Sequence, residues 1–141
     1  MKKETTLISA FPGVGKTYLK DNFKNLEIID SDSSTFDKEN FPQNYIQHIK
    51  NNMGKVDIIL ISSHEAVRKA LVEEGLLFIQ VYPDSKIKDE YIQRYRERGS
   101  NEEFIKILDE NWDTWIEQMK NQKRCAHIVL YSGQCLSTLF K

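Results

Sequence analysis

A glycine-rich segment near the start of the chain has the residue types and the spacing of a phosphate-binding loop. Ser9–Thr17 reads SAFPGVGKT, close to the pattern G-x-x-x-x-G-K-[ST]. Gly13 and Gly15 can adopt backbone angles that other residues avoid, so successive amide groups can turn toward one anion. Lys16 would then reach the β- and γ-phosphates of a nucleotide, and the Thr17 hydroxyl would ligate Mg²⁺.

The residues on either side of this segment predict the elements that would hold it. Thr5–Ile8 is short, apolar and β-branched, which is typical of a buried strand, and Tyr18–Phe23 has helical spacing. A strand, a loop and a helix in this order place the loop amides at the positive end of the helix. Ala10 departs from the pattern, since a glycine is expected there, and a glycine-rich turn that binds no phosphate is the alternative. The predicted cofactor-binding residues are Pro12, Gly13, Val14, Gly15, Lys16, Thr17 and Tyr18.

Two carboxylates follow the second predicted strand. Leu26–Asp30 has a strand pattern that ends in acid, and Asp32 comes two residues later in a polar turn. Ligands of open parallel sheets lie beyond the carboxyl ends of the strands, so we expect Asp30 and Asp32 beside the glycine-rich loop. There Asp32 would be a metal ligand, and either residue could orient or deprotonate an acceptor group. A turn of Asp and Ser residues without such a role is the alternative.

Further strand patterns alternate with helical ones along the rest of the chain. The strand patterns are Val56–Ile61, Leu76–Tyr82 and His127–Tyr131, and helical patterns cover 41–54, 62–75, 84–99 and 100–119. Ser62 with Glu65, and Ser100 with Glu103, have capping-box spacing at two helix starts. This alternation predicts an α/β fold of three layers, α/β/α, around a five-stranded parallel sheet.

The helical segment before Gly99 is rich in arginine. Arg94 and Arg98 repeat at an interval of four residues and therefore share one face of the predicted helix. Arginines before a glycine suit a lid that closes over a transferring phosphoryl group and neutralises its charge, which makes residues 84–101 the predicted lid. A solvated helix with its charges in surface pairs is the alternative.

The last long helical pattern carries a broad apolar stripe. We expect the stripe to pack against the sheet as core, although its tryptophans could in principle stack on a base. Its residues are Phe104, Leu108, Trp112, Trp115 and Met119.

Length, charge and cysteine content limit the classes of protein. The 141 residues fit a single domain, 1–141, and the formal net charge of −1 gives no general electrostatic argument for binding nucleic acid or membranes. No apolar run is long enough to span a bilayer and no signal region precedes the first strand, so a cytoplasmic location is expected. Cys125 and Cys135 lack the spacing of a metal site and are expected to be reduced thiols.

The glycine-rich loop, together with the arginine-rich segment before the last long helix, resembles the small P-loop kinases of the nucleoside monophosphate kinase group, which includes adenylate kinase and its shikimate- and gluconate-kinase relatives. The resemblance implies a P-loop NTPase fold with ATP and Mg²⁺ as cofactors. It implies that Lys16 and Thr17 bind phosphate and metal, and that Arg94 and Arg98 are the lid residues. The segment from Asp30 to Asp32 resembles the acidic pair of the hydroxyl-phosphorylating relatives.

The implied activity is ATP-dependent phosphoryl transfer to a nucleoside monophosphate or a related small acceptor, by a monomer or homodimer that does not bind membranes. Two alternatives stay open. The chain could be a nucleotide-binding regulatory module or slow NTPase, or it could phosphorylate a hydroxyl acceptor such as a nucleic-acid 5′ end. The last alternative is disfavoured by the neutral charge, but a local basic groove could form from Lys86, Lys88, Arg94, Arg96 and Arg98.

Overall fold

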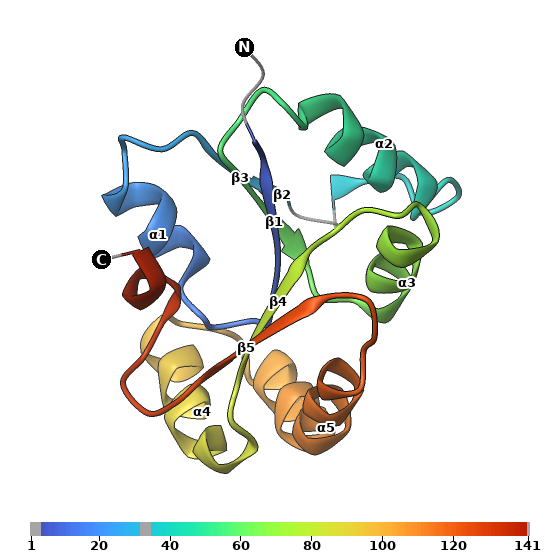
Figure 1. The fold of residues 1–141 in the computed structure, drawn as a ribbon. Coiled ribbons are helices and arrows are strands. Elements are labelled where there is room, and N and C mark those ends of the chain that lie inside the picture. The colour runs from blue at the N-terminus through green and yellow to red at the C-terminus, as the bar shows by residue number, and fades with distance from the viewer. Residues whose placement is uncertain (1–3, 32–34, 141) are drawn as a thin grey trace.

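The computed structural model describes residues 4–31 and 35–140, and within these residues five parallel strands form one sheet (Figure 1). The strands are β1 (Thr6–Ala10), β2 (Ile28–Ser31), β3 (Ile58–Ser62), β4 (Ile79–Pro83) and β5 (Ala126–Leu130). Their order across the sheet is β2-β3-β1-β4-β5, which places β1 at the centre. The prediction of an α/β fold with a five-stranded parallel sheet is confirmed.

Helices cover both faces of this sheet. They are α1 (Lys16–Asn22), α2 (Gln43–Asn52), α3 (Glu65–Glu73), α4 (Lys88–Glu97) and α5 (Glu102–Lys120), with 3₁₀ turns η2 (Ser85–Ile87) and η3 (Leu136–Phe140). In Figure 1, α1 and η3 lie on one side of the sheet and α2 and α3 on the other, while α4 and α5 lie toward the carboxyl ends of the strands. No helix in the described ranges is both long and apolar enough to cross a membrane.

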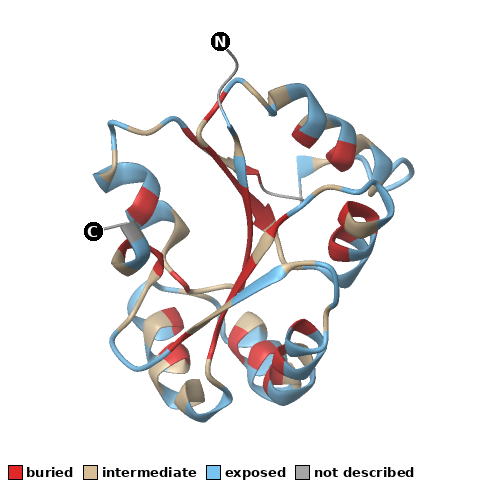
Figure 2. Cartoon of the chain, in the orientation of Figure 1, coloured by how far each residue is buried: buried red, intermediate tan, exposed pale blue. Residues whose placement is uncertain are grey.

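The core lies on both faces of the central strands. Along β1 and β3, side chains alternate between the two faces, so Ile8 and Leu60 join one cluster while Leu7 and Ile59 join the other. The first cluster also contains residues of α1, α4 and α5, and the second contains residues of α2 and α3. Burial on both faces explains why these strands are almost continuously apolar in sequence (Figure 2).

The register of the strands brings three loops to one edge of the sheet. Ala10 pairs with Ser62 across β1 and β3, and Ser31 pairs with Ile61 across β2 and β3. The carboxyl ends of these three strands are therefore level. Consequently, the glycine-rich loop after β1 lies beside the residues that end β2 and β3.

The predicted capping boxes are wrong at both helix starts. Ser62 still belongs to β3, where it pairs with Ala10, so the N-cap of α3 is His64, two residues later, and the helix begins at Glu65. At α5, the cap is Asn101, whose side chain accepts a hydrogen bond of 2.7 Å from the Phe104 amide. Ser100 cannot serve there because the asparagine, one residue nearer to the helix, already satisfies the amide.

The predicted lid segment folds as η2 and α4, and α4 packs on neighbouring elements. Tyr91 and Tyr95 of α4 are fully buried. The Tyr91 ring meets Trp112 of α5 edge to face, with centroids 5.5 Å apart, and meets Phe11 of the glycine-rich loop at 6.4 Å. In this structure α4 is therefore part of the wall behind the loop.

Candidate functional site

The glycine-rich loop after β1 depends on two left-handed backbone positions. Gly13 has a φ of 92° and Gly15, the N-cap of α1, has a φ of 98°. Gly13 is also tightly enclosed, since a Cβ atom there would lie 2.8 Å from Cε1 of Tyr95. Both the backbone angle and the close approach of α4 therefore require glycine at position 13.

Three consecutive carbonyl groups of this loop are held by donors outside it. The bonds run from Tyr95 Oη to Pro12 O (2.6 Å), from Arg94 Nη1 to Gly13 O (3.0 Å) and from the Leu136 amide to Val14 O (2.8 Å). In a planar trans peptide, the N–H points away from the C=O. The donors on α4 and η3 therefore orient these peptide groups so that the N–H next to each bonded carbonyl points away from α4 and η3.

Several amides of the loop are left without an acceptor. Within the described residues, no group accepts a hydrogen bond from the amides of Gly13, Gly15, Lys16 and Thr17, whereas the Val14 amide bonds to Phe11 O at 3.3 Å. Consecutive amides that lack protein acceptors form a concave donor set that suits an anion. Phosphate binding by these amides stays a prediction.

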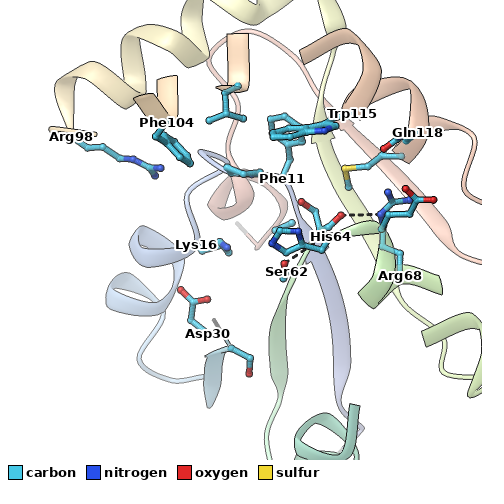
Figure 3. Close-up of a pocket in the computed structure, with 17 residues that line it drawn as sticks. Phe11, Lys16, Asp30, Ser62, His64, Arg68, Arg98, Phe104, Trp115 and Gln118 are labelled. Carbon is cyan, nitrogen blue, oxygen red and sulfur yellow. Dashed lines mark hydrogen bonds between the residues drawn. The ribbon is translucent and has the colours of Figure 1, made fainter. Parts of the chain in front are cut away.

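A cavity of about 680 Å³ opens beside this loop (Figure 3). Its size lies within the range of about 300–1,000 Å³ that is usual for small-molecule sites. It lies between the carboxyl ends of β1, β2 and β3 and the side of α5 that faces them. Its lining residues are Ala10, Phe11, Pro12, Lys16, Asp30, Ser31, Ser62, Ser63, His64, Glu65, Arg68, Arg98, Phe104, Leu108, Trp115, Gln118 and Met119.

Lys16 and Asp30 lie at the same end of the cavity. Both side chains line it, and Figure 3 shows them on neighbouring elements below Phe104 and Arg98. Among the described residues, Lys16 forms no ion pair, so its ammonium group is available to a ligand. Asp32, the second residue of the predicted acidic pair, lies outside the described residues.

The two long walls of the cavity differ in character. The wall from the ends of β2 and β3 is polar, with Ser62, Ser63 and His64. The opposite wall is aromatic and aliphatic, and Phe104 and Trp115 of α5 contribute half-buried rings to it. The cavity therefore offers a polar face and a stacking face to the same ligand.

The apolar stripe of α5 was predicted as core, and this prediction is confirmed, since Leu108, Trp112 and Met119 belong to the core cluster and Phe104 and Trp115 are packed against it. Trp112 is fully buried and donates its indole N–H to Ser85 O at 2.9 Å. Trp115, three residues later, is turned by about 300° around the helix; it is half-buried, packs against the core and also lines the cavity. The stripe is broad because it packs on the core along one side and lines the cavity along the other.

Arg68 lies on α3 at the opposite end of the cavity from Lys16 (Figure 3). Its side chain is buried, with Nε bonded to Ser63 O at 2.9 Å and Nη1 bonded to Gln122 Oε1 at 2.8 Å. Burial lowers the pKa of the guanidinium, and the nearby Glu65 carboxylate acts in the opposite direction. Arg68 was not among the predicted site residues, because its position at the cavity depends on how α3 lies against α5.

The two predicted lid arginines have different surroundings. Arg94 bonds to Gly13 O and to Gln134 O, pairs with Glu90 at 3.0 Å and lies 4.4 Å from the centroid of the Tyr91 ring. Arg98 is exposed, lines the cavity and donates only to Ser100 Oγ within the described residues. In this arrangement Arg94 holds the glycine-rich loop through its bond to Gly13 O, whereas Arg98 faces the cavity.

The remaining predicted site residues lie around the loop. Pro12 lines the cavity, Val14 is buried, and Thr17 and Tyr18 are exposed on the first turn of α1. Within the described part of the chain, no three His, Cys, Asp or Glu side chains gather as a set of metal ligands.

The cations that could form a basic groove are partly paired. Lys88 pairs with Asp109 at 2.8 Å, and the hydrogen bond that Lys88 donates to this carboxylate raises the pKa of Lys88. Arg94 is held by Glu90 and the loop carbonyls. Two of the five candidate cations are thus already engaged within the chain.

The chain matches no known protein family, and no curated protein is significantly similar to it in sequence. Fold and site together define a parallel α/β protein with a glycine-rich loop at the end of its central strand and an adjoining cavity.

Proposed function

We propose that this protein is an ATP-dependent phosphotransferase with a P-loop NTPase fold. One observation carries the proposal. The carbonyls of the loop are held by donors on α4 and η3, and the amides of Gly13, Gly15, Lys16 and Thr17 have no acceptor among the described residues. This loop adjoins a cavity of about 680 Å³, which is large enough for a second substrate.

In this proposal the loop residues bind the triphosphate of ATP. The amides of Gly13, Gly15 and Lys16 donate to phosphate oxygens, and the Lys16 ammonium neutralises the transferring group. Arg98, which lines the same end of the cavity, adds a second positive charge there. Phosphoryl transfer needs little covalent chemistry from the protein, so positioning and charge neutralisation account for most of the catalysis.

The residues present also fit a magnesium ion. Mg²⁺ takes one or two protein oxygens and completes its shell with water and substrate phosphates, so a cluster of three side chains is not required. The exposed Thr17 hydroxyl on the first turn of α1 is the residue that would hold it. The ion supplies neutralisation of phosphate charge when it is bound with ATP.

The experiment that tests this proposal is product detection. The purified protein is incubated with Mg-ATP and a panel of nucleosides, nucleoside monophosphates and 5′-hydroxyl oligonucleotides, and phosphorylated products are separated by chromatography. A new phosphorylated product that disappears in Lys16→Ala supports the proposal. ATP binding without any phosphorylated product would instead favour a nucleotide-binding regulatory module.

A further inference from the structure

We propose that the phosphoryl acceptor is a nucleoside, which is phosphorylated on a sugar hydroxyl and whose base stacks on Trp115. This inference rests on the proposed phosphotransferase function and decides between its phosphate and hydroxyl acceptors. The charges that line the cavity, the residues of its walls and the placement of Asp30 favour such an acceptor.

The charge balance of the cavity excludes a dedicated site for an acceptor phosphate. Among the described residues that line it, the cations are Lys16, Arg68 and Arg98, and the carboxylates are Asp30 and Glu65. Lys16 and Arg98 lie at the transfer end, where the triphosphate of ATP takes up their charge. The groups left to the acceptor are Arg68 and the two carboxylates, which together carry a charge of −1.

A nucleoside monophosphate would add a charge of about −2 to that of Arg68, Asp30 and Glu65, which together are already negative. Its phosphate must reach the transfer end, where it would meet the Asp30 carboxylate. Among the described residues, the cations at this end are Lys16 and Arg98, which the triphosphate of ATP already engages. Arg68 cannot compensate, because it lies at the far end of the cavity and has Glu65 beside it (Figure 3). A neutral acceptor carries no such repulsion.

Asp30 has the placement that a hydroxyl acceptor needs. It lies beside Lys16 at the transfer end and is half-buried, and its carboxylate has no hydrogen-bond partner among the described residues. In the transfer step the hydroxyl oxygen forms a bond to Pγ of ATP while the bond from Pγ to the β,γ-bridging oxygen breaks. The electron pair of that bond leaves with ADP, and the hydroxyl proton passes to the Asp30 carboxylate.

The walls of the cavity indicate a planar ring in the acceptor. Trp115 presents a half-buried indole to the cavity, and its N–H has no acceptor within the described residues, in contrast to that of Trp112. Across from it lie Ser62 and His64, which contribute polar groups. Stacking of a base on an aromatic side chain contributes about 1–3 kcal/mol.

The far end of the cavity suits the edge of a nucleobase. Arg68 is fixed by Ser63 and Gln122 in one orientation and has only donors, while Gln118 supplies both a donor and an acceptor. Carbonyl and ring-nitrogen groups of a base pair with such a set. An aliphatic sugar or hydroxy acid would leave Trp115 without a stacking partner.

The first test compares acceptors. Wild-type protein is given Mg-ATP with each ribo- and deoxyribonucleoside and, separately, with each 5′-monophosphate. We expect conversion of at least one nucleoside to a monophosphate and no diphosphate from the monophosphates. Diphosphate formation would overturn the inference and leave the phosphotransferase proposal intact; absence of ATP binding would overturn both.

The second test measures binding without turnover. Nucleoside is titrated in the presence of a non-hydrolysable ATP analogue while tryptophan fluorescence is recorded. We expect quenching in the wild type and little change in Trp115→Phe, which retains only the buried Trp112. Equal quenching in both proteins would contradict stacking on Trp115.

Variants of the polar residues complete the test. Gln118→Leu is expected to raise KM for the nucleoside about tenfold, without altering KM for ATP, because one hydrogen-bonded contact is lost. Thr114→Ala, at an exposed position of the same helix outside the cavity, is the matched control. Asp30→Asn should lower kcat by about 10²-fold or more. Unchanged kcat in Asp30→Asn would overturn its role as base.

Discussion

The hydroxyl of Tyr95 donates a hydrogen bond of 2.6 Å to the carbonyl oxygen of Pro12, and so joins α4 to the glycine-rich loop from behind. Tyr91, one turn earlier on the same helix, is equally buried, but its hydroxyl has no hydrogen-bond partner within the described residues. Burial raises the pKa of Tyr91 to about 12, so its hydroxyl stays neutral. The two tyrosines therefore form a natural pair for testing how α4 orients the loop.

Tyr95→Phe should weaken ATP binding about fivefold, since one neutral hydrogen bond contributes about 1 kcal/mol to holding the loop peptide in place. Tyr91→Phe should leave ATP affinity unchanged and should not lower the free energy of unfolding, because it removes an unpartnered hydroxyl. Calorimetric titration and urea unfolding measure the two quantities. Equal ATP affinities for the two variants would show that the bond to Pro12 does not orient the loop.

We expect the two arginines to have different roles: Arg94 stabilises the fold, and Arg98 acts on the substrate. Arg94→Gln removes bonds to Gly13 and Gln134 and is expected to lower the free energy of unfolding by about 2 kcal/mol. Arg98→Gln, at an exposed position, should change stability by less than about 0.5 kcal/mol but reduce kcat at least about tenfold. Thermal unfolding and turnover of both variants check this, and the reverse pattern would contradict the assignment.

Gly13→Ala should be markedly more destabilising than Gly99→Ala. Both positions have a positive φ, which costs about 1–2 kcal/mol for alanine. At Gly13 the added Cβ would also lie 2.8 Å from the Tyr95 ring, whereas at Gly99 nothing lies within 4 Å. Overpacking should add about 1–3 kcal/mol at Gly13 alone, as measured by urea unfolding. Similar losses of stability in the two variants would mean that α4 moves to make room for the Cβ atom added at position 13.

Glu90 makes a pH-dependent contribution to stability. The hydrogen bond from Ser132, together with the Gly133 amide and Arg94, lowers the pKa of Glu90 below its ordinary value of 4.5. A carboxyl whose pKa is lower in the folded chain than in the unfolded chain adds stability at pH values above its ordinary pKa. This added stability is lost as the pH falls through the pKa of the folded chain. Wild type should therefore be more stable than Glu90→Gln at pH 7, and this difference should shrink below pH 4.5. Urea unfolding of both proteins at pH 7 and below pH 4.5 measures this difference in stability. A difference that is the same at the two pH values would exclude ionised Glu90 as its source.

Local signals in the sequence predicted the sheet and the loop. The apolar runs of β1 and β3 and the glycines at 13 and 15 act over a few residues, so their pattern can be read without knowing the fold. Helix starts were less predictable, because two polar residues compete for each cap, as Ser100 and Asn101 do.

The rest of the site depends on contacts between distant parts of the chain. Arg94 bonds to Gly13 across 81 positions, so no local pattern distinguishes it from Arg98, which lines the cavity. Trp115 and Arg68 meet the cavity only because α5 and α3 pack where they do. Sequence spacing placed both tryptophans on one helical stripe but could not tell which side of the stripe faces an open space.

The most direct test of the account is the affinity of Mg-ATP for the wild type, Lys16→Ala and Lys20→Ala by calorimetric titration. Lys20 is exposed one turn further along α1 and does not line the cavity, so it controls for loss of a positive charge on the same helix. We expect wild type and Lys20→Ala to bind alike, and Lys16→Ala to bind about 10–100-fold more weakly, since a charge-assisted contact contributes about 1.5–3 kcal/mol. Equal affinity of all three proteins, or no binding to the wild type, would contradict the assignment of the glycine-rich loop as the site of the nucleotide phosphates.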